Sequence, residues 1–229
     1  MLKHLSKGIV LYLLKMEGFN TVDMRLKAPF TAVLAGPTGS GKTHYMMGLI
    51  KGRETVTTVP PIEVIYCYGA WQDKFNDLLD DGVRLQEGLL PIDDLPNDGN
   101  PRWLIMDDLM EEVSGKDSVN NIFTKYSHHR NISVFFMVQN LFKKTNRTIT
   151  LNAHYMFLFK NPRDKQFIDH LARQAFPSKV QQVRQVYERV TADPYSFLLL
   201  DMRQETDERC RLVENFAIPG KTMYVYALT

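Results

Sequence analysis

The sequence predicts an α/β fold in which a mostly parallel sheet carries helices on both of its faces. Three observations predict it. From about residue 30, short runs rich in β-branched and aromatic residues alternate with helical segments. The run 132–138 contains a single polar residue, Ser133, as expected for a central strand buried on both faces. A glycine-rich turn joins the first run of the pattern directly to a helix.

Each element follows from a local signal. The first strand, 30–35, is apolar except for Thr31, the second follows a Pro60-Pro61 break, and the third is an apolar run that stops at two aspartates. In chain order, we expect strands at 30–35, 62–68, 103–106, 132–138, 155–159, 195–200 and 222–226. We expect helices at 42–51, 73–79, 118–129, 164–175 and 178–190, and a surface loop at 93–102, which is rich in Asp, Pro, Asn and Gly.

Length and composition fit one large domain. The chain has 229 residues, of which 44% are hydrophobic and 24% charged, and a formal charge of +2 that neither demands nor excludes nucleic acid. Two distant cysteines, Cys67 and Cys210, give neither a metal spacing nor a disulfide framework, so an intracellular compartment is expected. No apolar stretch approaches the roughly 20 residues of a membrane span, so no membrane partner is expected.

The chain is expected to divide into an N-terminal helical arm, 1–29, and a single α/β domain, 30–229, which contains the glycine-rich turn. The stretch Met1–Met16 is rich in leucine and superficially resembles a signal peptide. Its longest apolar run, Ile9–Leu14, is too short for that, and no small-residue cleavage site follows. An amphipathic helix on the core or on a neighbouring subunit is expected instead.

The glycine-rich turn matches the phosphate-binding loop Gly-x-x-x-x-Gly-Lys-Ser/Thr. Glycines allow positive φ and a close approach to phosphate, and the N–H groups at the start of the following helix point at the anion. Lys42 is expected to reach the β- and γ-phosphates of ATP, and the Thr43 hydroxyl to ligate Mg²⁺. The expected nucleotide-binding residues are Gly36, Pro37, Thr38, Gly39, Ser40, Gly41, Lys42, Thr43 and His44.

Two aspartates end the third strand. The apolar run before Asp107 is typical of the strand that supplies a magnesium-binding carboxylate, and we expect this strand to lie beside the one that bears the phosphate loop. Asp107 would hold Mg²⁺ through water, and Asp108 would orient or deprotonate the attacking water. The alternative is an aspartate pair that caps the next turn.

Polar residues flank the 132–138 strand. Gln139 ends it and can contact both the γ-phosphate and the attacking water, a role that Asn140 can share; the alternative is an amide that satisfies loop backbone groups. Arg130 precedes the strand and can serve as an arginine finger for a neighbouring subunit. The alternative for Arg130 is a cation at the end of helix 118–129. Arg163 and Arg173 are weaker candidates for the finger.

A basic loop follows Gln139. Lys143, Lys144 and Arg147 lie within one short segment tied to the 132–138 strand. Such a loop can grip a phosphate backbone and move with the nucleotide cycle, or it can be a solvated loop without a partner.

Motifs typical of particular classes of nucleotide-binding protein narrow the choice of family. The chain has no Asn-Lys-x-Asp for guanine and no arginine-rich lid of the nucleoside-kinase sort. The acid after the third strand, the amide after the fourth and the arginine before it indicate a P-loop NTPase of the RecA-like, additional-strand kind. The segments 123–142, 152–164, 171–177 and 194–201 resemble the FtsK/HerA-type viral genome-packaging ATPases, the poxvirus-type enzymes of Polinton, adintovirus and adomavirus-like elements.

This resemblance implies a homo-oligomeric, ring-shaped motor that translocates double-stranded DNA into a viral capsid at the site of virion assembly in the host cell. It implies the same roles for Lys42, Thr43, Asp107, Gln139 and Arg130. The chain departs from the broader families at one position, because they carry Glu where this chain has Asp108. Two alternatives for the catalytic base follow: Asp108 reaches the attacking water after small shifts, or Glu111 or Glu112 helps. Two alternative functions remain: a helicase or other nucleic-acid remodeller, and a nucleotide-gated assembly factor that does not hydrolyse ATP.

Overall fold

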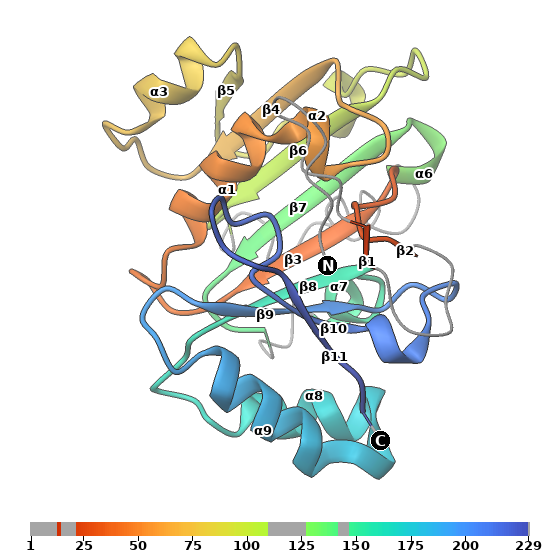
Figure 1. Ribbon diagram of the computed structural model, residues 1–229. Coiled ribbons are helices and arrows are strands. Elements are labelled where there is room, and N and C mark those ends of the chain that lie inside the picture. Colours follow the sequence, from red (N-terminus) through yellow and green to blue (C-terminus); the bar gives the residue numbers. More distant parts are fainter. Residues whose placement is uncertain (1–12, 15–21, 110–126, 142–146, 229) are drawn as a thin grey trace.

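A sheet runs through the centre of the molecule (Figure 1). The computed structural model describes residues 13–14, 22–109, 127–141 and 147–228. Within them, nine strands form this sheet in the order β11-β10-β9-β8-β3-β7-β6-β4-β5. Their bounds are β3 Thr31–Ala35, β4 Glu63–Tyr68, β5 Arg84–Glu87, β6 Arg102–Asp107, β7 Ile132–Val138, β8 Tyr155–Phe159, β9 Phe197–Asp201, β10 Leu212–Glu214 and β11 Tyr224–Tyr226.

The sheet is parallel from β8 through β3, β7, β6 and β4 to β5. The remaining pairings, from β8 to β9, β10 and β11, are antiparallel. A parallel sheet must be covered on both faces because helical crossovers join its strands. All residues of β3 and β7 are buried, as this requires. The predicted α/β class is therefore confirmed.

Helices cover both faces, and alternating residues of each strand point to opposite sides. On β3, Ala32 and Leu34 pack in the core cluster that contains the buried residues of α1 and α3. Val33 and Ala35 pack in the cluster that contains those of α8 and α9. The helices are α1 Lys42–Lys51, α2 Arg53–Val56, α3 Phe75–Asp80, α6 Ser127–His129, α7 Arg147–Leu151, α8 Phe167–Ala175 and α9 Val180–Val190, with 3-10 turns at Ile92–Asp94, Pro177–Lys179 and Glu208–Cys210.

β7 lies between β3 and β6 and pairs with both. The expectation that the Asp107 strand lies directly beside the phosphate-loop strand is therefore wrong. The local sequence of a strand does not determine its neighbours in the sheet. Here β7, which comes later in the chain, is inserted as an additional strand between β3 and β6. The carboxyl ends of β3, β7 and β6 consequently meet at one edge of the sheet, which is where ligands bind in open α/β folds.

The described part of the segment 1–29 contains two short strands and no helix. β1 Leu13–Leu14 pairs with β2 Val22–Asp23, so the helix expected over 1–16 is wrong at Leu13 and Leu14. Leu26 is fully buried and forms a bridge with Thr57, which fastens this stretch to the core of the domain. The rest of the expected helical arm lies outside the described residues, as does 118–126 of the helix expected over 118–129. No described helix is both long and apolar enough to cross a membrane.

Candidate active site

The phosphate loop connects β3 to α1 at the carboxyl edge of the sheet. Gly39 and Gly41 have φ of 79° and 97°, which side chains rarely tolerate. Gly36 is required for a different reason, because a Cβ there would lie 2.7 Å from Phe159 Cβ and 2.8 Å from Ser40 Oγ. Gly41 is also the N-cap of α1 and directs the positive end of this helix at the loop. The loop has the backbone geometry of an anion-binding site.

Lys42 lies against the loop that it is expected to serve. Its ammonium donates to the carbonyls of Gly36 (2.6 Å) and Pro37 (3.1 Å). Burial lowers the pKa of Lys42, an effect that the nearby carboxylates of Asp107 and Asp108 oppose. Ser40 Oγ is buried and has no hydrogen-bond partner among the described residues. A buried hydroxyl without a partner is costly, and a phosphate oxygen in the loop would satisfy it.

Asp107 is the last residue of β6 and is held from two sides. Its side chain is on the α1 face because it alternates with Trp103 and Ile105, which pack there. The hydroxyl of Tyr66, on β4, donates a hydrogen bond to Asp107 Oδ2 at 2.6 Å, and the Thr43 hydroxyl donates one to the same oxygen at 3.4 Å. Burial raises the pKa of Asp107, whereas the Tyr66 hydrogen bond lowers it. Burial and the adjoining carboxylate raise the pKa of Tyr66, which keeps its proton.

Asp108 and Gln139 form a hydrogen-bonded pair. Gln139 Nε2 donates to Asp108 Oδ2 at 2.8 Å, and both side chains are exposed. Asp108 has a φ of 55°, a left-handed conformation that points it away from Asp107. Backbone bonds tie this pair to the loop: Gly36 N donates to Val138 O, and Asp108 N donates to Met137 O. The end of β7 therefore connects the phosphate loop to both acidic residues.

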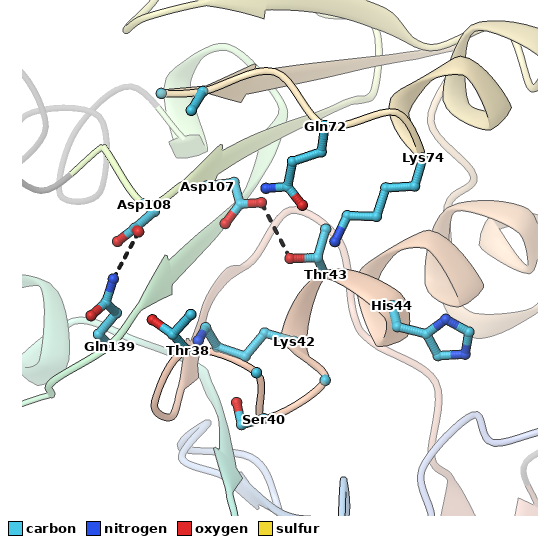
Figure 2. Close-up of a pocket in the computed structure, with 14 residues that line it drawn as sticks. Thr38, Ser40, Lys42, Thr43, His44, Gln72, Lys74, Asp107, Asp108 and Gln139 are labelled. Carbon is cyan, nitrogen blue, oxygen red and sulfur yellow. Dashed lines mark hydrogen bonds between the residues drawn. The ribbon is translucent and has the colours of Figure 1, made fainter.

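These side chains line one cavity of about 390 Å³. Figure 2 shows Lys42, Thr43 and Asp107 on one side of it and Asp108 with Gln139 on the other. The lining residues include Thr38, Gly39, Ser40, Gly41, Lys42, Thr43, His44, Asp107, Asp108 and Gln139. Gly36 and Pro37 contribute their carbonyls to Lys42 instead, and His44 points away from the acidic residues (Figure 2). The expected nucleotide and metal residues are thus brought together.

Three further polar side chains belong to this site and were not expected. Gln72 and Lys74, from the loop before α3, extend toward Thr43 and Asp107 (Figure 2). Tyr66 is the third, through its bond to Asp107. The sequence signal for Tyr66 is weak: a tyrosine in an apolar strand gains meaning only once β4 is paired with β6, in a register that puts Tyr68 opposite Asp107. Gln72 and Lys74 have no sequence signal at all.

The arginine and lysine candidates lie elsewhere. Arg130 precedes β7 and Gln139 follows it, so the two residues lie at opposite ends of a strand of 7 residues, which at about 3.3 Å per residue spans roughly 20 Å. Its guanidinium donates to the carbonyl of Leu95 at 2.7 Å. Arg163 is exposed in the loop after β8, at the edge that carries the phosphate loop, and Arg173 is exposed on α8. Lys143, Lys144, Glu111 and Glu112 lie outside the described residues, and Arg147 begins α7.

The fold is similar to that of solved structures whose sequences differ widely from this one. No family model and no curated protein sequence matches the chain. The cytoplasmic domain of the type VII secretion ATPase EccC from Thermomonospora curvata superposes with a TM-score of 0.51 at 11% identity, over 92% of this chain and 27% of that one. The genome packaging NTPase B204 from Sulfolobus turreted icosahedral virus 2, in complex with sulfate, gives 0.49 at 13% identity, over 87% and 97%.

Identities this low show the fold alone, and this chain spans about a quarter of the EccC chain. The parallel core, the additional strand β7 and the phosphate loop at the carboxyl edge define the class of protein. The chain has the α/β, RecA-like fold of the P-loop NTPases.

Proposed function

We propose that this chain is an ATP-hydrolysing motor that translocates double-stranded DNA into a viral or virus-like capsid. One observation carries the ATPase part. The phosphate loop, the buried Asp107 and the hydrogen-bonded Asp108–Gln139 pair line a single cavity at the carboxyl edge of the sheet. These groups supply what phosphoryl transfer needs, namely a phosphate cradle, a metal ligand and a group beside the attacking water.

The residues present fit Mg²⁺ bound together with a nucleotide. Thr43 Oγ1 and Asp107 Oδ2 are 3.4 Å apart, close enough for one to bind the ion directly and the other through water. The described residues contain no cluster of three or more His, Cys, Asp or Glu that could hold a metal alone. Mg²⁺ commonly binds in this way, with one or two protein ligands, several waters and the substrate phosphates. The bound ion would neutralise charge that develops on the phosphates.

Each residue then has a defined task. Lys42 exchanges the carbonyls of Gly36 and Pro37 for phosphate oxygens, and in doing so places a positive charge on the transferred group. Asp108 is exposed on the cavity wall and accepts a proton from the attacking water, with Gln139 orienting its carboxylate. Gln139 also follows β7 directly, so a change at the γ-phosphate would reach the segment beyond β7.

That segment is where we place the coupling to DNA. Lys143 and Lys144 follow Gln139 by a few residues, and a basic loop there would contact phosphates without reading sequence. The packaging part of the proposal depends on the four sequence segments that resemble the FtsK/HerA-type packaging ATPases. A ring of identical subunits, a capsid partner and action at the site of virion assembly belong to the same proposal.

A trans-acting arginine is also part of this proposal. Arg130 is too far from its own cavity to act there, so it can serve only a neighbour's site. If it does, mixing Arg130→Ala subunits into wild-type rings suppresses hydrolysis by more than the mutant fraction. A proportional fall supports the alternative, in which Arg130 only fastens the end of α6 to Leu95. The same mixing experiment with Arg163→Ala tests the arginine at the other edge.

Steady-state ATP hydrolysis with and without double-stranded DNA tests the proposal. We expect Mg²⁺-dependent turnover that duplex DNA stimulates. Lys42→Ala should abolish turnover, whereas Lys51→Ala, at the exposed far end of α1, should leave it unchanged. Tight ATP binding without turnover would favour the nucleotide-gated assembly factor instead. Separation of annealed strands would favour a helicase.

A further inference from the structure

A second hollow adjoins the phosphate cavity at the start of α1. This groove, of about 510 Å³, lies between α1 and two loops, the one before β9 and the one after β10. It is mostly apolar, and its walls include Tyr45, Pro194, Tyr195, Phe197, Ile218 and Pro219. Gly41 and His44 line both the groove and the phosphate cavity, so the two hollows are continuous across the start of α1. We call it the α1–β9 groove.

Tyr195 is the most distinctive residue of the α1–β9 groove. Its side chain is exposed (70%), and its backbone has a φ of 61°, an unusual conformation for a residue with a large side chain. Bonds on either side hold it there: Ser196 Oγ donates to Asp193 O at 2.6 Å, and Lys160 N donates to Ser196 O at 3.0 Å. An exposed aromatic ring on a constrained backbone is a ready stacking surface.

The ring lies directly beside the phosphate loop. A Cβ added to Gly41 would be 3.3 Å from Tyr195 Cβ and 3.4 Å from its Cδ1. Thr43 and Asp107, which would hold the metal beside the β- and γ-phosphates, line the phosphate cavity but not the α1–β9 groove. The remainder of a nucleotide must therefore leave the loop past Gly41 and His44, which leads it into the α1–β9 groove.

We propose that the α1–β9 groove binds the ribose and base of the nucleotide, with the base stacked on Tyr195. This inference rests on the proposed nucleotide binding and adds the part of the site that recognises the nucleoside. Its size suits such a ligand, because ligand pockets are typically about 300–1,000 Å³ and mostly apolar. Continuity with the phosphate cavity identifies the occupant as the same molecule rather than a second ligand.

The lining also sets how the base is selected. Among the residues that the structure describes, no Asp or Glu lines the groove, so none of them offers a carboxylate to accept from the N1–H and amino group of guanine. Stacking and apolar contact favour the larger purine surface over pyrimidines but discriminate weakly between purines. A site built on hydrogen bonds can reject an analogue by about 10⁴-fold or more, whereas this lining is mostly apolar, with a few polar side chains in His44, Ser196, Asn215 and Lys221. We expect ATP and GTP to bind within about tenfold of each other, and CTP and UTP more weakly.

Calorimetric titration of the full chain with Mg²⁺-ATP and with Mg²⁺-tripolyphosphate tests this inference. Tripolyphosphate fills the phosphate loop but carries no base. Base–aromatic stacking corresponds to about 5- to 150-fold in affinity, so Tyr195→Ala should weaken ATP binding by that factor. Tripolyphosphate binding should be unchanged, and Tyr195→Phe should bind both as the wild type does.

A second variant guards against a purely local loss of structure. Gly48 lines the groove, and a Cβ there would meet no atom within 4 Å. Leu is a far better helix former than Gly, so Gly48→Leu should fold while filling the groove. It should weaken ATP binding and leave tripolyphosphate binding intact.

Three outcomes would overturn the inference: wild-type ATP affinity in both variants, an equal loss of ATP and tripolyphosphate, or a preference between ATP and GTP well above tenfold. Failure of the wild-type chain to bind either ligand would instead contradict the proposed nucleotide function itself.

Discussion

Tyr66→Phe removes one oxygen from the candidate active site and should impair magnesium use. The Tyr66 hydroxyl is buried and bonds to Asp107 Oδ2 at 2.6 Å. Without it, the only remaining described partner of that oxygen is the Thr43 hydroxyl at 3.4 Å. A hydrogen bond to a charged group contributes about 1.5–3 kcal/mol, and each 1.4 kcal/mol is tenfold. Loss of such a supporting partner typically costs 10- to 100-fold in metal affinity or activity.

The assay is ATP hydrolysis as a function of Mg²⁺ concentration. We expect the half-saturating Mg²⁺ concentration of Tyr66→Phe to rise about 10- to 100-fold. Tyr155→Phe is a matched control, because Tyr155 is a buried tyrosine at the start of β8 whose hydroxyl accepts from Lys27 N at 3.0 Å, far from the cavity. The control should keep wild-type Mg²⁺ dependence. Wild-type dependence in Tyr66→Phe as well would refute the argument that Tyr66 positions Asp107.

Three further predictions follow from single residues. Gly36→Ala forces a Cβ into its neighbours and should weaken ATP binding about 5- to 150-fold by titration, whereas Gly52→Ala, whose nearest contact would be 3.5 Å, should not. Asp108→Asn should lower kcat about 10²- to 10⁴-fold with the KM for ATP nearly unchanged; an unchanged kcat would move the base to another residue. The hydrogen-bonded ion pair with Arg184 holds the pKa of Asp169 below its ordinary value of 3.8. The pair therefore stabilises the folded state fully above pH 3.8, and this stabilisation is lost as the pH falls through the lowered pKa. Asp169→Asn should therefore lower the Tm at pH 7, and the difference should vanish in strong acid; a difference that persists there contradicts the assignment.

The bounds of helices and strands were predictable where a motif or a long apolar run marks them. The helix expected over 42–51 and the strands expected over 132–138 and 155–159 have the bounds that the structure shows. Two strands of the nine-stranded sheet were missed, and so were β1 and β2, which lie where a helical arm was expected. β5 Arg84–Glu87 is a short, polar strand at the edge of the sheet, and β10 Leu212–Glu214 has three residues, too few for a periodic signal. Their pairing partners, not their own residues, make them strands.

The residues of the candidate site were likewise predictable only where a local sequence signal marks them. Phosphate contact depends on residues with a fixed spacing, so the loop and Lys42 were identifiable from sequence alone. Asp107 was identifiable because it ends an apolar run. Tyr66 and Tyr195 were not, since each acquires its role from a neighbour that is distant in the chain, Asp107 for one and Gly41 for the other. The strand order, which inserts β7 and the Gln139 that follows it between the phosphate-loop strand and the Asp107 strand, was likewise a tertiary property.

The most direct test of the central claim is translocation along duplex DNA, measured by displacement of a third strand bound in a triplex. With ATP and Mg²⁺, the wild-type chain should release the third strand and leave the duplex annealed, while Lys42→Ala should release nothing. Hydrolysis without release of the third strand, or separation of the duplex itself, would contradict the account of this chain as a DNA-translocating motor.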